Sequence, residues 1–182
     1  MKTPETITTT KWNLDAAHSE IQFKAKHLLI TTVTGEFKKY EATVETEGDD
    51  FTTATITFTA DTASVDTGSE QRDGHIKSAD FFDIEKFPKL KFVSTKIEKK
   101  DADNFILHGD LTIRDVTKSV TLNVEFGGIA KDPWGGTRAG FNVTGKVNRK
   151  DFGLNWNVLT EGGGMLVSEE VKIVASVQLV KA

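Results

Sequence analysis

The chain has 182 residues, of which 37% are hydrophobic and 27% charged, with a formal net charge of −4 and a pI near 5.6. This length suits one all-β domain, and the charges alternate in sign along the chain, so a nucleic-acid partner is not expected. The absence of cysteine excludes disulfides and thiolate metal sites, and no apolar run approaches the ~18 residues of a membrane-spanning helix.

The first eleven residues are polar and rich in threonine. They contain neither an apolar core nor a small-residue cleavage site, so no secretory signal is predicted. We expect residues 1–11 to form a flexible segment and residues 12–182 to form a single domain. The predicted location is cytoplasmic for the chain as sequenced, or periplasmic if a signal peptide has been removed.

Apolar and polar residues alternate with a period of two through most of the chain, which is typical of half-buried strands. Turn signals separate the alternating segments at spacings that suit hairpins and leave no room for repeated crossover helices. The sequence therefore predicts an all-β fold, an extended antiparallel β-barrel of about eight strands whose closure removes exposed sheet edges. The expected strands lie near residues 21–25, 37–45, 55–60, 89–99, 105–113, 120–126, 141–147 and 171–179.

One stretch, residues 67–83, does not alternate. Thr67 is followed three residues later by Glu70, which is the spacing of a capping box. We therefore expect one short polar helix over about residues 68–79, lying at one end of the barrel as a plug or a lid. The apolar residues expected to hold it against the barrel are Ile76, Phe81 and Phe82.

Several inward positions near the strand centres carry very small residues. An eight-stranded barrel is about wide enough either to be filled by its own side chains or to hold one ligand, and small inward residues favour the ligand. The alternative is that the glycines mark bends and the alanines fit a tapering solid core. The expected ligand-binding residues are Phe23, Ala25, Phe58, Ala60, Phe92, Leu107, Gly109, Leu111, Phe126, Phe141, Val143, Gly145, Ile173 and Ala175.

Four polar or aromatic residues are candidates for contact with a ligand head group. Arg72 and His75 lie on the expected helix, while Trp134 and Arg138 lie in a loop that could form part of the rim. Each pair also has a simpler explanation. The first pair fits a solvated helix face, and the second fits a packed loop.

The sequence contains no pattern typical of catalysis or of a metal site. The histidines form no metal-binding pair, the serines lack a nucleophile elbow, and the glycine run at residues 162–164 lacks a Walker lysine and indicates a flexible loop. We therefore expect no catalytic residue, no bound metal and no cofactor. The four histidines are His18, His27, His75 and His108.

Five ordered segments have distinctive sequences: residues 12–19, 70–83 (EQRDGHIKSADFFD), 109–118 (GDLTIRDVTK), 132–141 (DPWGGTRAGF) and 149–153 (RKDFG). They resemble motifs of the YceI-like family, and the resemblance runs from about Trp12 to Val180. It implies an extended, lipocalin-like eight-stranded barrel with a helix beside it. It also implies non-covalent binding of a long isoprenoid, such as a polyprenyl phosphate or a quinone, or of a fatty-acid-derived amide.

The leading interpretation is a carrier or store of a long-chain isoprenoid or fatty-acyl lipid. One alternative is a lipid-modifying enzyme that uses the same cavity, with His18, His27 or His108 as its titratable group. Another is a protein-interaction module with a solid core. The sequence leaves homodimerisation open.

Overall fold

The computed structural model describes residues 8–158 and 166–182, so residues 1–7 and the glycine run at 162–164 lie outside the described part. Within that part, no helix is long and apolar enough to cross a bilayer. The helical elements are η1 (Ala16–His18), η2 (Thr62–Ser64), α1 (Glu70–Lys77) and η3 (Arg149–Phe152). The strands are β1 (Thr9–Leu14), β2 (Glu20–His27), β3 (Thr31–Phe37), β4 (Tyr40–Glu47), β5 (Asp50–Asp61), β6 (Val65–Asp66), β7 (Lys89–Lys99), β8 (Asn104–Ile113), β9 (Val116–Lys131), β10 (Thr137–Asn148) and β11 (Glu170–Lys181).

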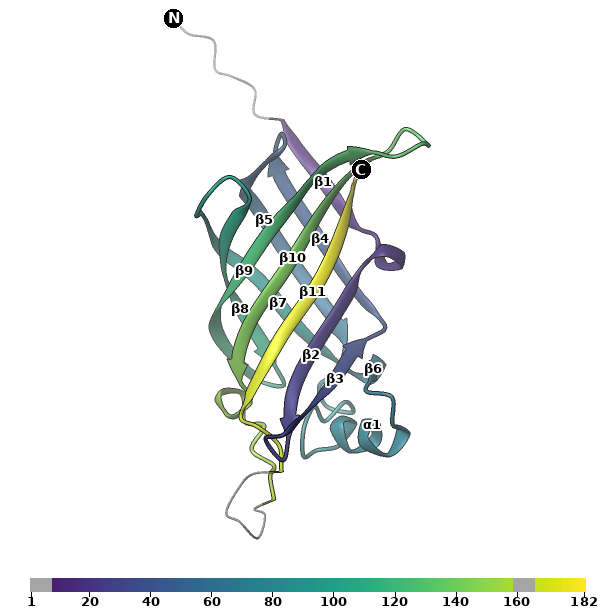
Figure 1. Cartoon of the computed structure of the whole chain (residues 1–182), viewed down its shortest axis with the longest axis vertical. Coiled ribbons are helices and arrows are strands. Elements are labelled where there is room, and N and C mark those ends of the chain that lie inside the picture. The colour runs from purple at the N-terminus through teal and green to yellow at the C-terminus, as the bar shows by residue number, and fades with distance from the viewer. Residues whose placement is uncertain (1–7, 159–165) are drawn as a thin grey trace, which may run out of the picture.

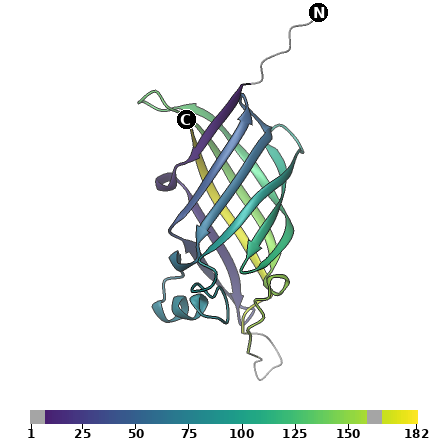
Figure 2. The ribbon, with the colours of Figure 1, turned by 180° about the vertical axis from the view of Figure 1, so that it is seen from behind.

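Eight strands form a closed antiparallel ring in the order β1-β4-β5-β7-β8-β9-β10-β11, and β11 pairs back with β1. The first part of β11 pairs instead with β2, which is followed in the sheet by β3 and β6. Figure 1 shows an elongated barrel with the C-terminus at one end and α1 at the other, and Figure 2 shows the opposite wall. The predicted eight-stranded antiparallel barrel is confirmed.

Three strands lie where alternation did not predict them: β1, β3 and the two-residue β6. β1 begins at Thr9 and pairs with β4, so the barrel starts inside the segment expected to be flexible. β3 has only Val33 and Phe37 as large apolar residues, so its alternation is weak. Its third inward position is Gly35, and the ring of Phe23 fills the space beside that glycine. A Cβ atom at Gly35 would lie 2.3 Å from Cζ of Phe23.

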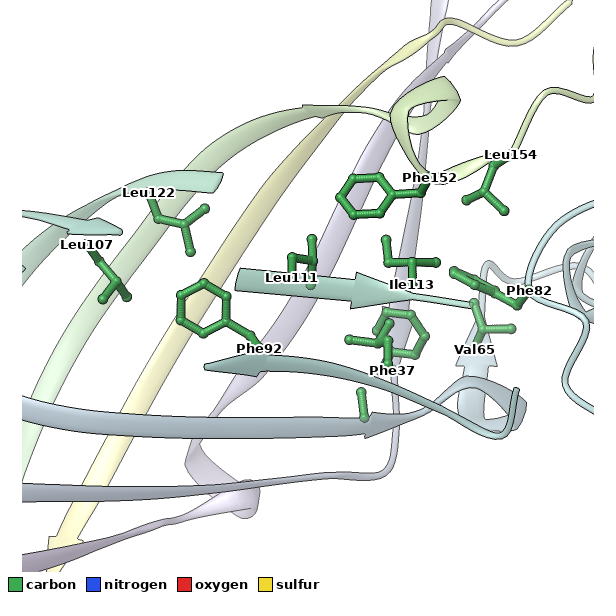
Figure 3. Close-up of a cluster of buried hydrophobic side chains, with 12 residues drawn as sticks. Phe37, Val65, Phe82, Phe92, Leu107, Leu111, Ile113, Leu122, Phe152 and Leu154 are labelled. Carbon is green, nitrogen blue, oxygen red and sulfur yellow. The ribbon is translucent and has the colours of Figure 1, made fainter. Parts of the chain in front are cut away.

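The half of the barrel next to α1 contains the larger cluster of buried side chains. Figure 3 shows Phe152 and Leu154, which follow β10, beside Ile113 of β8 and Phe82 of the segment after α1. The ring of Phe82 lies 5.8 Å from that of Phe37, measured between centroids. Phe82 therefore attaches the helical segment to the barrel, as predicted.

A second cluster fills the end of the barrel that holds the C-terminus. Trp12 is 1% exposed, and its Nε1–H donates to Oγ1 of Thr46 at 3.0 Å. The ring of Phe51 packs against those of Trp12, Phe126 and Phe141, with centroids 5.1, 5.7 and 4.9 Å away. These packed aromatic rings fill the interior at this end of the barrel.

Helix α1 is shorter than the expected helix at 68–79, and its cap is a different residue. Oγ of Ser69 accepts the backbone N–H of Arg72 at 3.3 Å, so Ser69 and not Thr67 is the N-cap. Both the backbone N–H and the hydroxyl of Thr67 donate to Oδ1 of Asp73, at 2.8 and 2.6 Å. Thr67 therefore ties the preceding segment to the first turn of the helix.

Candidate functional site

An internal cavity of about 1010 Å³ extends from Phe51 and Phe141, at the closed end of the barrel, to helix α1. This volume lies at the upper end of the range for small-molecule pockets. Most lining side chains are apolar, and they come from strands all around the barrel. The polar lining residues are Gln22, Lys26, His27, Thr31, Thr67, Ser69, Gln71, Arg72, His75 and Arg149.

The solvent-exposed lining residues identify the open end of the cavity. Among the described residues that line it, those classed as exposed all lie on α1 or beside the β2–β3 turn, whereas the rest are buried or half-buried. The cavity therefore opens at the α1 end, which we call the mouth. Its exposed residues are Lys26, His27, Thr31, Gln71 and Arg72.

Two of the head-group candidates, Arg72 and His75, line the mouth. Nε and Nη2 of Arg72 donate to Oγ1 and the carbonyl oxygen of Thr67 at 2.7 and 2.6 Å, which fixes the guanidinium beside the opening. Nε2 of His75 lies 2.9 Å from Oδ2 of Asp80, and its ring meets the ring of Trp156 edge-on at 4.5 Å. Both side chains are thus held in place by neighbouring residues at the mouth.

Arg149 supports the opposite side of the mouth, a role that the sequence analysis missed. It is 4% exposed and continues the inward alternation of β10 by two residues beyond Val147. Burial lowers the pKa of its guanidinium. Its hydrogen bonds go to backbone carbonyl oxygens: Nε to Ser168 (2.9 Å), Nη1 to Leu154 (2.6 Å) and Trp156 (2.7 Å), and Nη2 to Val167 (3.2 Å).

Most of the residues predicted to bind ligand line the cavity. They come from β2, β5, β7, β8, β10 and β11, as their strand phase predicted. The predicted residues in the lining are Phe23, Ala25, Phe58, Phe92, Leu107, Leu111, Phe141, Val143, Ile173 and Ala175.

Two predicted glycines point inward but are covered by side chains of neighbouring strands, so their place in the lining was wrongly predicted. A Cβ atom at Gly109 would lie 2.3 Å from Cζ of Phe92, and one at Gly145 would lie 2.4 Å from Cδ2 of Leu122. These glycines therefore make room for larger neighbours and leave no empty space.

Ala60 and Phe126 also lie outside the cavity lining, contrary to the prediction. Ala60 is 1% exposed and packs in the larger core cluster. Phe126 packs against the rings of Phe51 and Phe141 at the closed end. Both side chains therefore pack against other core residues and do not face the cavity.

The other two head-group candidates lie at the end of the barrel opposite the mouth. Trp134 is 85% exposed in the β9–β10 loop, which Figure 1 shows at the end opposite α1. Arg138 donates from Nε to Oδ2 of Asp132 at 2.9 Å and from Nη1 to the carboxylate of Asp15. Hydrogen bonds from His18 and Arg138 lower the pKa of Asp15. Arg138 therefore joins the loop to η1 and is remote from the mouth.

The titratable groups that line the cavity are basic and lie at the mouth. Lys26, His27, Arg72, His75 and Arg149 are in the lining, and no Asp or Glu is among the described lining residues. Across residues 8–158 and 166–182, no three His, Asp or Glu side chains gather where a metal ion could bind. The site combines an apolar interior with a basic opening, which suits an amphiphile with a polar or anionic end.

His18 and His108, the other two candidates for the titratable group of the enzyme alternative, lie outside the cavity lining. Nδ1 of His18 is 2.7 Å from Oδ2 of Asp15, and Nε2 of His108 is 3.1 Å from Oε2 of Glu98. Both histidines are thus paired with carboxylates away from the cavity.

A closed antiparallel barrel around an apolar cavity with one open end defines the class of ligand-enclosing barrels. The model of the YceI-like domain matches residues 12–179, and the chain belongs to this family. The chain is 38% identical over 170 residues to a UPF0312 protein of Staphylococcus aureus, which covers 93% of this chain and 96% of the relative. The family membership predicted from the sequence is confirmed.

Solved structures of other proteins share the fold. BcnA from Burkholderia cenocepacia gives a TM-score of 0.77 at 24% identity, covering 91% of this chain and 98% of that chain. A polyisoprenoid binding domain from Saccharophagus degradans, implicated in plant cell wall breakdown, gives a TM-score of 0.66 at 15% identity, covering 92% and 97%. At these identities the likeness concerns the fold alone.

Proposed function

We propose that the protein binds one long-chain apolar lipid non-covalently inside the barrel and serves as its carrier or store. The observation that carries this proposal is the apolar cavity of about 1010 Å³, whose exposed lining residues are polar throughout the described part of the chain. Burial of each methylene group is worth about 0.8 kcal/mol, so a long chain binds such an interior with few polar contacts.

An isoprenoid, such as a polyprenyl phosphate or an isoprenoid quinone, is the proposed ligand class. The S. degradans neighbour is a polyisoprenoid binding domain, which supports an isoprenoid chain. The basic groups at the mouth, Lys26, Arg72 and Arg149, favour an anionic end over a neutral one. A fatty-acyl chain with an acidic head group meets the same requirements and is distinguished by identification of the ligand.

Binding without turnover fits the distribution of polar groups better than catalysis does. General acid–base chemistry requires a titratable side chain within hydrogen-bond reach of the reacting atom. Here the titratable lining groups lie at the mouth, and the apolar interior offers none among the described residues. We therefore propose a binding protein. A chemical change in bound lipid that is lost on His27→Ala or His75→Ala would contradict this proposal.

The proposal is tested by native mass spectrometry of the purified protein, followed by organic extraction and identification of the lipid released. We expect one long-chain lipid per chain. A protein that carries no lipid, and that takes up neither isoprenoids nor fatty-acyl chains added in detergent, would contradict the proposal. It would favour an interaction module in its place.

A further inference from the structure

Three consecutive apolar side chains project into solvent at the turn between β2 and β3. Leu28, Leu29 and Ile30, which we call the apolar tip, are 40%, 57% and 76% exposed. Val158, which is 49% exposed, adds to the same surface. The backbone N–H of Leu28 donates to the carbonyl of Leu166 at 2.9 Å, and that of Leu166 donates to the carbonyl of Val158 at 3.0 Å. Exposed apolar side chains that lie together mark an interaction surface.

The backbone of the apolar tip is unfavourable for the residues it carries. Leu28 and Leu29 have φ values of 53° and 61°, and the turn is closed by the N–H of Ile30 donating to the carbonyl of His27 at 3.1 Å. Turns with positive φ at both central positions strongly prefer Asn-Gly, because side chains with a Cβ atom are strained there. Local folding therefore does not explain two leucines at this turn.

The apolar tip lies directly beside the mouth of the cavity. His27 and Thr31, which pair across the turn on either side of the tip, both line the mouth, as does Lys26. Leu166, which holds the tip through its carbonyl oxygen, lines the cavity as well. A surface that covers the tip would therefore also meet the opening through which a lipid enters and leaves.

The strand that leads to the tip is basic. Between Phe23 and Glu36 the chain carries Lys24, Lys26 and His27 and no acidic residue. Lys24 lies opposite Lys172 in the next strand, and Lys172 lies opposite Lys146 in the strand beyond. Like charges that face each other across strands destabilise a sheet. Glu170, 3.3 Å from Lys146, offsets this charge only in part. A nearby anionic surface would relieve the remaining repulsion.

We propose that the apolar tip inserts into the surface of a lipid bilayer that contains anionic lipids, and so holds the mouth of the cavity against the membrane. Within residues 8–158 and 166–182 the patch consists of three side chains and Val158, far fewer than the roughly 20–30 residues that a stable protein interface uses on each side. Insertion into a bilayer depends instead on buried apolar area together with attraction of basic residues to anionic lipids. The docking rests on the tip alone, and its use in lipid exchange rests on the proposed function.

The test is co-flotation of the full chain with phosphatidylcholine vesicles, prepared with and without phosphatidylglycerol. The tip variant is Leu28→Asn/Leu29→Gly/Ile30→Ser, which removes the apolar side chains and installs the residue pair that the turn prefers, so loss of folding is not expected. The matched control is Trp134→Ser, which removes the most exposed large apolar side chain described, at the opposite end of the barrel.

We expect the wild type to float with vesicles that contain phosphatidylglycerol, and its membrane affinity to fall about tenfold or more in the tip variant. The Trp134→Ser control should retain the affinity of the wild type. Three results would overturn the proposal. They are equal flotation of the wild type and the tip variant, an equal loss of affinity in the Trp134→Ser control, and a wild type that floats with neither kind of vesicle.

Loading of the cavity from detergent micelles, measured by native mass spectrometry, separates this proposal from the proposed function. A tip variant that loads lipid from micelles but takes it from vesicles more slowly than the wild type supports a role of docking in exchange. If the wild type floats but never loads lipid, the proposed function fails while docking stands. If it loads lipid but never floats, docking fails while the proposed function stands.

Discussion

Replacing Arg149 by methionine removes the hydrogen bonds that hold one side of the mouth together. The four bonds join η3 to the carbonyl groups of Leu154, Trp156, Val167 and Ser168. A hydrogen bond to a charged group contributes about 1.5–3 kcal/mol when it is deleted alone. Because the four losses overlap and water reaches the carbonyl groups nearest the mouth, we expect a total cost of about 3–5 kcal/mol.

Urea unfolding followed by tryptophan fluorescence and far-UV circular dichroism measures this cost. With a slope of about 2 kcal/mol per molar urea for a chain of this size, the midpoint should fall by about 2 M. The matched control is Lys150→Met at the next position. Lys150 is exposed and its Nζ lies 2.7 Å from Oε1 of Glu169, so its loss should cost no more than about 1 kcal/mol. An Arg149→Met variant as stable as the control would refute this reasoning.

Two further substitutions test the closed end and the core. The pKa of Asp15 is lowered in the folded state, so its contribution to stability is present above about pH 4 and is lost as the pH falls through the lowered value. The stability difference between wild type and Asp15→Asn, measured by urea unfolding, should therefore shrink below about pH 4. A difference that stays constant down to about pH 2 contradicts this account. Gly109→Ala places a Cβ atom 2.6 Å from the carbonyl oxygen of Val93 and should lower stability by about 1–3 kcal/mol. Gly140→Ala, with nothing within 4 Å of the new atom, should be nearly neutral, and equal effects of the two substitutions would count against the packing argument.

Strand phase predicted the direction of side chains but not what lies over them. Alternation placed both Ala175 and Gly109 on the inner face, yet only Ala175 lines the cavity. The difference depends on the cross-strand neighbour, because the ring of Phe92 covers Gly109. The register between strands is set by pairing along the whole sheet. The alternation within one strand therefore does not reveal which side chain of the next strand lies over a given residue.

The residues of the mouth were predicted in part. The helix motif placed Arg72 and His75 together, and both line the cavity. The interaction that takes Arg138 away from the mouth joins it to Asp15, 123 positions earlier in the chain, and no local pattern reveals such a contact. Arg149 did carry a local signal, because it continues the inward alternation of β10 where a charged residue is unexpected.

The most direct test of lipid binding inside the barrel is a comparison of two neighbouring residues on β11. Ala175 is 7% exposed and lines the cavity, whereas Ser176 is exposed and lies outside the lining. Native mass spectrometry after incubation with a long-chain polyprenyl phosphate should show one bound lipid for the wild type and for Ser176→Phe, and little or none for a folded Ala175→Phe. Equal uptake by both variants would contradict the assignment of this cavity as the lipid site.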